Sequence, residues 1–213
     1  MATIPNGITG QFIGSAGNVT GYILNGKNFL RSRRSKSNKP MTQPRLAQQQ
    51  KIKVCNAFTS AFSGTGFLNT TFPAYGAAGS GYNRATSSLM NQAITGTYPE
   101  FYLTWQKVLV SQGPLPSAEF AGVAAHEGGT LFFNWTDNTG TGTAKANDKV
   151  VLAVYCPATQ QVVSSLHGAY RADCLATLSA AIFKGHIVET WIGFISNDAQ
   201  DAANSVYTGS VQL

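Results

Sequence analysis

Short apolar segments separated by turn-rich loops fill the second half of the chain and constrain its fold more than any other feature. Residues 129–136, 149–156, 161–166, 174–179, 186–196 and 205–213 each have the apolar pattern of a strand. Six or seven strands at this spacing in about 100 residues fit an immunoglobulin- or fibronectin-like β-sandwich. The fold class we expect is therefore mainly β, with some helix (α+β).

One of these strands, 186–196, is apolar on both faces. Alternation places Ile187, Trp191 and Ile195 on one face and Val188, Ile192 and Phe194 on the other. Because successive side chains of a strand point to opposite faces, such a strand needs cover on both sides. The second cover would be either a subunit contact or a packed N-terminal domain.

The first 44 residues predict a β-ribbon followed by a basic arm. In segment 18–32, Asn25-Gly26 lies between two apolar runs, and this dipeptide is the strongest short-range hairpin signal because both turn positions need positive φ. Segment 31–44, RSRRSKSNKPMTQP, has five cations and no apolar periodicity. We expect it to be an exposed arm or loop.

Two helices are predicted next. Thr42 is a candidate cap for an amphipathic helix that has Pro44 in its first turn and ends before Gly64, and a second helix is expected from Asn83 to Gly96. Residues 100–111 alternate as a strand does. The Gly- and Pro-containing segment 112–118 then suggests a domain boundary, with a basic N-terminal assembly region over 1–111 and the sandwich over 112–213.

Charge is divided unevenly along the sequence. Residues 1–99 carry ten Lys or Arg and no acidic residue, whereas residues 100–213 carry five Lys or Arg and all nine acids. The halves therefore have net charges of +10 and −4. Such an asymmetry fits an arm that binds nucleic acid or another anionic surface, and it equally fits subunits that meet through opposite charges.

The candidate binding residues are the cations of this basic stretch. They are Arg31, Arg33, Arg34, Lys36, Lys39, Arg45, Lys51 and Lys53. If they bind phosphates, the binding should depend strongly on salt and little on base sequence. The alternatives are a solvated loop, or a loop seated on the acidic sandwich of a neighbouring subunit.

No catalytic or metal motif is present. The sequence has no GxSxG, no phosphate-binding loop and no HExxH, and its three histidines are widely spaced, so we expect no enzyme, no metal centre and no cofactor. Segment 137–148 superficially resembles a calcium loop, but a turn rich in Asp and Asn is the other interpretation. Cys156 and Cys174 either form a pair or remain free thiols.

Five stretches agree, in order and spacing, with a known family. Residues 6–32, 34–53, 93–116, 135–155 and 191–213 resemble an uncharacterised family of Bacteroidota-type bacteria, a domain of unknown function. The resemblance implies a basic N-terminal part and a sandwich-like C-terminal part. It implies no activity, cofactor or catalytic residue, and the cysteines do not belong to the family pattern.

The sequence thus favours a non-enzymatic structural protein that self-assembles into a filament, shell or virion-like particle through its ribbon and basic arm. The alternatives are a nucleic-acid-binding module and a sandwich-type adhesin or carbohydrate-binding protein. The expected partners are other copies of the chain, with nucleic acid as a further candidate and no small-molecule substrate. No signal peptide or membrane span is recognisable, so a cytoplasmic location or a released particle is expected.

Overall fold

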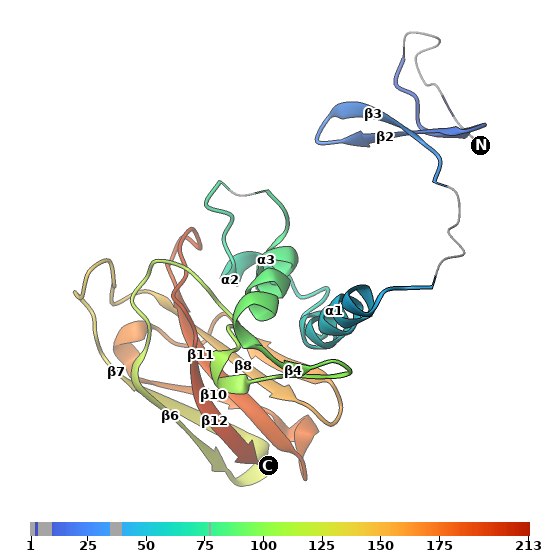
Figure 1. The fold of residues 1–213 in the computed structure, drawn as a ribbon. Helices are drawn as coiled ribbons and strands as arrows, with labels where there is room; N and C mark the ends of the chain where they lie inside the picture. Colours follow the sequence, from blue (N-terminus) through green and yellow to red (C-terminus); the bar gives the residue numbers. More distant parts are fainter. Residues whose placement is uncertain (1–2, 4–9, 35–39, 77) are drawn as a thin grey trace. The chain divides into compact units, whose positions relative to one another are not determined.

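The computed structural model describes residues 3, 10–34, 40–76 and 78–213 (Figure 1). The chain separates into two compact units, which we call the N-terminal unit (Met1–Thr42) and the main unit (Gln43–Leu213). The N-terminal unit contains one antiparallel sheet in the order β1-β2-β3, formed by β1 (Gly14–Ala16), β2 (Val19–Leu24) and β3 (Lys27–Ser32). Asn25 and Gly26 connect β2 to β3 with φ of 50° and 74°, which confirms the predicted hairpin.

The main unit begins with helices. Helix α1 (Gln43–Ala61) starts directly after Thr42, as predicted, and the short helix α2 (Phe67–Thr71) follows it. Helix α3 (Gly81–Ser88) starts two residues earlier than predicted, because the Ser80 hydroxyl accepts a hydrogen bond from the Asn83 N–H and caps the helix there. It continues as a π-turn, η2 (Leu89–Ala93), into the hairpin of β4 (Ile94–Thr97) and β5 (Glu100–Leu103).

The rest of the main unit is a sandwich of two antiparallel sheets, as the strand pattern predicts. The three-stranded sheet has the order β10-β7-β6, from β6 (Glu119–His126), β7 (Thr130–Thr136) and β10 (Leu175–Ser179). The four-stranded sheet has the order β12-β11-β8-β9, from β8 (Lys149–Cys156), β9 (Gln161–Ser165), β11 (Ile187–Ile195) and β12 (Val206–Gln212). The fold is thus mainly β, with a fibronectin-like sandwich and a few helices.

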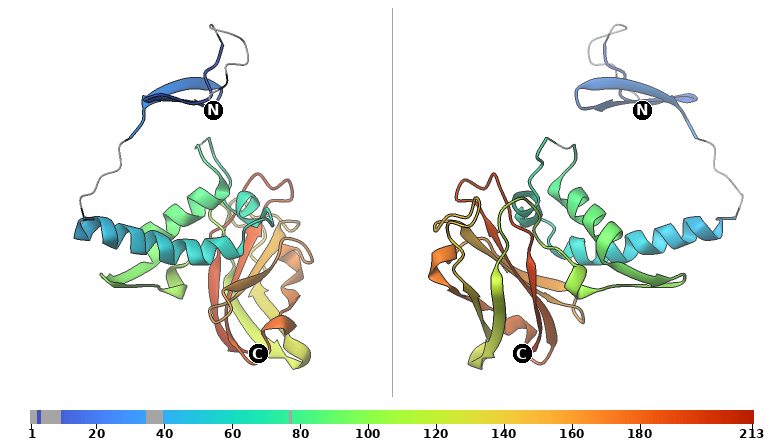
Figure 2. Two further views of the ribbon diagram at one scale, coloured as in Figure 1. Left: turned by 90° about the vertical axis from the view of Figure 1, so that its right-hand side faces the viewer. Right: turned by 60° about the vertical axis from the view of Figure 1, so that its left-hand side comes forward.

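Two hydrophobic cores lie on opposite faces of the four-stranded sheet. Inside the sandwich, Val188, Ile192 and Phe194 pack with residues of β7 and β8. On the outer face, Trp191 and Ile195 pack with residues of α1, α2 and α3, and Figure 2 shows the helices lying along this side. The second cover that β11 needs is therefore the helical part of the same chain.

The division into compact units differs from the boundary expected at residue 112. Residues 43–111 share a core with the sandwich, and backbone contacts continue across the expected boundary. The Ser205 hydroxyl accepts hydrogen bonds from the N–H groups of Val110 and Ser111, and the N–H of Leu115 bonds the carbonyl of Ala202. Segment 112–118 is thus hydrogen-bonded to the sandwich. The division between the two compact units falls in the chain between Thr42 and Gln43.

The strand expected over 100–111 is shorter than predicted. Pairing with β4 ends at Leu103, and a 3-10 turn, η3 (Trp105–Lys107), follows. This turn places Trp105 against Phe58, with their ring centroids 6.2 Å apart. Burial of this indole against α1 therefore replaces continued strand pairing.

Candidate functional site

The sheet of the N-terminal unit exposes apolar side chains on both faces. Residues paired across antiparallel strands share a face, so Leu30 lies on the face of Ile23, while the stacked rings of Tyr22 and Phe29 lie on the other. Leu30 is 63% exposed and Leu24 is 55% exposed. Among the described residues of this unit, Gly21 alone is buried. The unit thus has no hydrophobic core of its own in residues 3 and 10–34.

Three of the predicted binding residues belong to this unit and are exposed. Arg31 is on β3, where its guanidinium lies 5.6 Å from the centre of the Tyr22 ring. Arg33 and Arg34 follow the end of β3. Lys36 and Lys39 lie outside the described residues. Arg31 therefore combines a phosphate-binding group with an aromatic face, and Arg33 and Arg34 add charge next to it.

The other three predicted binding residues lie on α1, in the main unit. Arg45 and Lys53 are exposed, and the Lys51 ammonium lies 5.1 Å from the centre of the Phe101 ring. They occupy the part of α1 before Cys55, which is the first buried residue of the helix. The predicted basic stretch is therefore divided between two compact units.

The division of charge between the units is sharper than that between the halves of the sequence. Residues 1–42 carry six Lys or Arg and no acid, whereas residues 43–213 carry nine of each. The entire net charge of +6 is therefore carried by the N-terminal unit.

The segment 137–148 is organised by its own side chains. Asp137 accepts hydrogen bonds from the hydroxyl and the N–H of Thr139, and these bonds hold the pKa of Asp137 below its usual value. At the other end, Asp148 accepts from the N–H of Lys145 and pairs with Arg171. This geometry is that of a turn rich in Asp and Asn. In the part of the chain that the structure describes, no group of three His, Cys, Asp or Glu is placed to hold a metal ion.

Arg171 forms a buried polar cluster that the sequence pattern did not reveal. Its Nε lies 3.0 Å from Asp148 Oδ2, one terminal nitrogen donates to Asn138 Oδ1 at 2.6 Å, and the other donates to the Pro116 carbonyl at 3.1 Å. The guanidinium carbon lies 3.8 Å from the centre of the Phe194 ring. Burial lowers the pKa of Arg171, and the bond and charge of Asp148 oppose that shift. The cluster joins the loops at one end of the sandwich, and its three side chains are buried.

The three cysteines are free thiols. Cys55 and Cys156 are buried in the two separate cores, and burial raises the pKa of the Cys55 thiol. Cys174 lies in the turn before β10 and is not bonded to Cys156. In the described ranges, no helix is both long enough and apolar enough to cross a membrane.

The family comparison agrees with the resemblance seen in the sequence. The model of a family of unknown function, DUF6266, matches residues 11–209. The chain belongs to DUF6266. No curated protein matches this DUF6266 chain. Among solved structures, one match is the solution structure of the fn3 domain of the human collagen alpha-1(XX) chain, with 17% sequence identity and a TM-score of 0.32; it covers 48% of the DUF6266 chain and 87% of that domain.

Proposed function

We propose that this protein is a non-enzymatic structural protein that self-assembles through its N-terminal unit. The observation that supports the proposal is the exposure of apolar side chains on both faces of the β1-β2-β3 sheet. Units of about 40 residues usually need a disulfide, a metal or a partner chain to be stable. Residues 1–42 contain no Cys, His, Asp or Glu, so neither a disulfide nor a typical metal site is available to them. We propose that a partner chain supplies the missing apolar cover.

Charge favours a second copy of the chain as that partner. Residues 112–213 carry four Lys or Arg and eight acids, a net charge of −4, and Glu119, Glu127 and Asp173 are exposed. A basic unit on one copy and an acidic sandwich on the next would make a head-to-tail contact between unlike surfaces. Repetition of such contacts generates rings or open filaments. The second candidate is a polyanion such as nucleic acid, favoured by the exposed Arg31, Arg33 and Arg34.

Size-exclusion light scattering with negative-stain electron microscopy, at low and high salt, tests the proposal. The full chain should form particles well above its 22.6 kDa monomer mass. The double variant Ile23→Ser/Leu30→Ser, which removes two exposed apolar side chains from one face of the N-terminal sheet, should be monomeric. A matched control is Ile182→Ser, because Ile182 is 68% exposed in the main unit, and this control should assemble normally.

Two results would contradict the proposal. A full chain that is monomeric at every salt concentration would contradict self-assembly, and normal assembly of the Ile23→Ser/Leu30→Ser variant would contradict assembly through the N-terminal sheet. The ratio of absorbance at 260 and 280 nm separates the second candidate. Nucleic-acid binding through the arginines would be supported instead by particles that contain nucleic acid and dissociate in high salt, and that form equally well from the Ile23→Ser/Leu30→Ser variant.

A further inference from the structure

The main unit contains an open groove that the proposed assembly does not use. It has a volume of about 830 Å³ and lies between the α3–η2 helical segment, the loop after α2, segment 112–114 and Asn204. This volume falls in the range of about 300 to 1,000 Å³ that is typical of small-molecule sites. All of these elements belong to the main unit, so the groove is complete within one copy of the chain.

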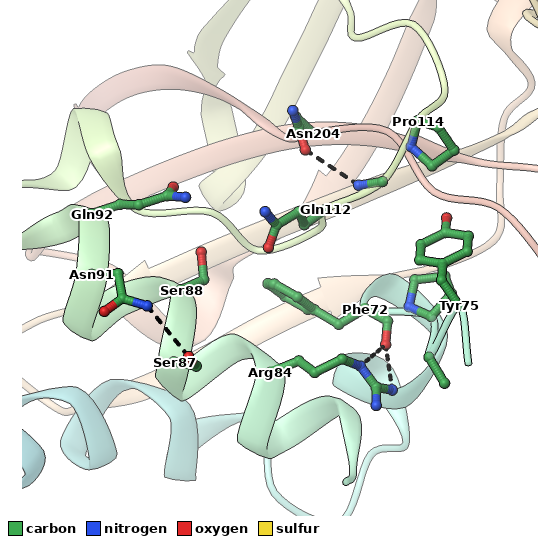
Figure 3. A pocket seen from close by; sticks show the side chains of 13 residues that line it. Phe72, Tyr75, Arg84, Ser87, Ser88, Asn91, Gln92, Gln112, Pro114 and Asn204 are labelled. Carbon is green, nitrogen blue, oxygen red and sulfur yellow. Dashed lines mark hydrogen bonds between the residues drawn. The ribbon is translucent and has the colours of Figure 1, made fainter. Parts of the chain in front are cut away.

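Neutral amides are four of the eight polar side chains that line the groove. They are Asn91 and Gln92 on the π-turn, Gln112 in segment 112–114 and Asn204 before β12. Within the residues that the structure describes, Asn204 Oδ1 accepts from the Gly113 N–H at 3.2 Å, while the amides of Gln92 and Gln112 have no hydrogen-bond partner. Figure 3 shows these two amides facing the space of the groove. Each carries donors and an acceptor, so it can bond a ligand hydroxyl in either sense.

Among the described residues, one charged side chain lines the groove, and it is already hydrogen-bonded. Arg84 donates from Nε and one terminal nitrogen to the Phe72 carbonyl, at 2.9 and 2.6 Å, and from the other terminal nitrogen to the Gly79 carbonyl at 2.7 Å. All three nitrogens of its guanidinium therefore donate hydrogen bonds to backbone carbonyls. No acidic residue lines the groove. These features disfavour an anion that needs a bidentate arginine and a cation that needs a carboxylate.

Tyr75 supplies an aromatic wall that is held in an uncommon conformation. Its φ is 44°, in the left-handed region that bulky residues rarely adopt, and its side chain is 54% exposed. The hydroxyl accepts a hydrogen bond from the Ala202 N–H at 3.2 Å. A Cβ at position 113 would lie 2.5 Å from this hydroxyl, so Gly113 is needed for the close approach. Non-glycine residues with left-handed backbone are concentrated at binding and active sites, and here such a residue presents an exposed ring whose hydroxyl end is held by a hydrogen bond.

We propose that this groove binds a neutral saccharide, with Tyr75 against an apolar face of a sugar ring and Gln92 and Gln112 on its hydroxyls. Figure 3 shows Tyr75 and Gln92 at opposite ends of the groove, so a short oligosaccharide can reach both. Sugar hydroxyls donate and accept at once, as side-chain amides do, and the C–H face of a pyranose is apolar, as a tyrosine ring is. The inference does not depend on self-assembly, because the groove lies in the main unit.

Isothermal titration of the full chain with maltotetraose, cellotetraose, xylotetraose and mannotetraose tests the inference, with saturation-transfer NMR to detect weak binding. At least one of these neutral sugars should bind. Tyr75→Ala should weaken that binding by about tenfold or more, the loss expected when an aromatic contact worth about 1.4 kcal/mol is removed. Gln92→Ala and Gln112→Ala should each weaken it by several-fold.

Two control variants and two control ligands make the result specific. Tyr102→Ala removes a tyrosine that is 59% exposed on β5, away from the groove, and should leave affinity unchanged. Tyr75→Phe keeps the ring and should retain most of the binding, which covers the case in which Tyr75→Ala does not fold. Trigalacturonate and tetra-alanine represent acidic sugars and peptides. The inference is overturned if no neutral tetrasaccharide binds, or if only trigalacturonate or tetra-alanine binds. It is also overturned if Tyr75→Phe, Tyr75→Ala and Gln112→Ala all bind the neutral sugar with the affinity of the wild-type chain.

Discussion

At the scale of single residues, Arg171 is the most consequential polar side chain of the sandwich interior. It is fully buried and pairs with Asp148, which is itself almost fully buried. Arg171→Met keeps much of the volume but leaves the Asp148 carboxylate buried without its partner. Removing one member of a buried pair typically costs about 3 to 5 kcal/mol, and we expect a loss of this size in urea unfolding. Arg171→Met/Asp148→Asn should recover part of it, and a single-variant loss below about 1 kcal/mol would refute the role given to the pair.

Tyr207 makes the free energy of unfolding decrease as pH rises into the alkaline range. Its hydroxyl donates to Glu189 Oε2, and burial, followed by this bond and the charge of Glu189, raises the pKa of Tyr207 to about 12. The folded state therefore keeps a proton that the unfolded tyrosine loses near pH 10. The resulting stability is complete below pH 10 and is lost as pH rises toward 12. In urea unfolding, the free-energy advantage of wild type over Tyr207→Phe should shrink between pH 10 and 12, and a constant difference would contradict this assignment.

The sequence could not have identified the Arg171 cluster or the groove. Arg171 lies in a turn, where an arginine is ordinarily solvated, and its partners come from positions 23 to 55 residues away. The groove likewise joins Tyr75, Gln92, Gln112 and Asn204, which no sequence spacing relates. The exposed Arg31, Arg33 and Arg34 were predictable, because a cluster of cations without nearby acids has no local alternative to solvent or an anionic partner.

At the scale of elements, the alternation of apolar residues was sufficient to predict the bounds of the regular strands. Strand β8 has the bounds predicted from its sequence, and β11 and β12 differ by one residue at each end. Strand β6 was missed because its register shifts between Glu119 and Gly122, where Phe120 has φ of 49° and is 85% exposed. A bulge of this kind interrupts the period-two pattern on which strand prediction depends.

Helix α1 explains why β8 and β11 are apolar on both faces. The Phe58 ring lies 4.9 Å from that of Tyr155 and 5.8 Å from that of Trp191, so one helical side chain covers both central strands. The sequence showed that a cover was needed but left a subunit and an N-terminal domain as equal alternatives. Only the three-dimensional arrangement, in which α1 and the sheet share a core, decides between them.

At the scale of the whole molecule, charge and apolar exposure coincide in the N-terminal unit. Its 42 residues hold all of the net positive charge, and its described residues present apolar side chains that remain in contact with solvent. The main unit is neutral overall and has two closed cores. The two cores and the surface proposed for self-assembly thus lie in different parts of the chain, so truncation can separate folding from the proposed association.

Truncation tests this division directly. A fragment of residues 43–213 keeps both cores and should unfold cooperatively as a monomer. A fragment of residues 112–213 keeps the sandwich interior but removes α1, so Trp191 and Tyr155, now buried, would face water. Exposing a large buried apolar side chain costs about 1.5 to 3 kcal/mol, so exposing both approaches the lower end of the roughly 5 to 15 kcal/mol that stabilises a typical domain.

The shorter fragment should therefore aggregate, or bind a dye specific for exposed apolar surface, under conditions in which the longer one stays monomeric. Light scattering and near-ultraviolet circular dichroism measure both properties. A control with Trp191→Ser in the 112–213 fragment should reduce aggregation, because it makes the uncovered face less apolar. A monomeric 112–213 fragment as stable as 43–213 would instead show that the helices cover the sheet without stabilising it, and that the domain boundary lies near residue 112 after all.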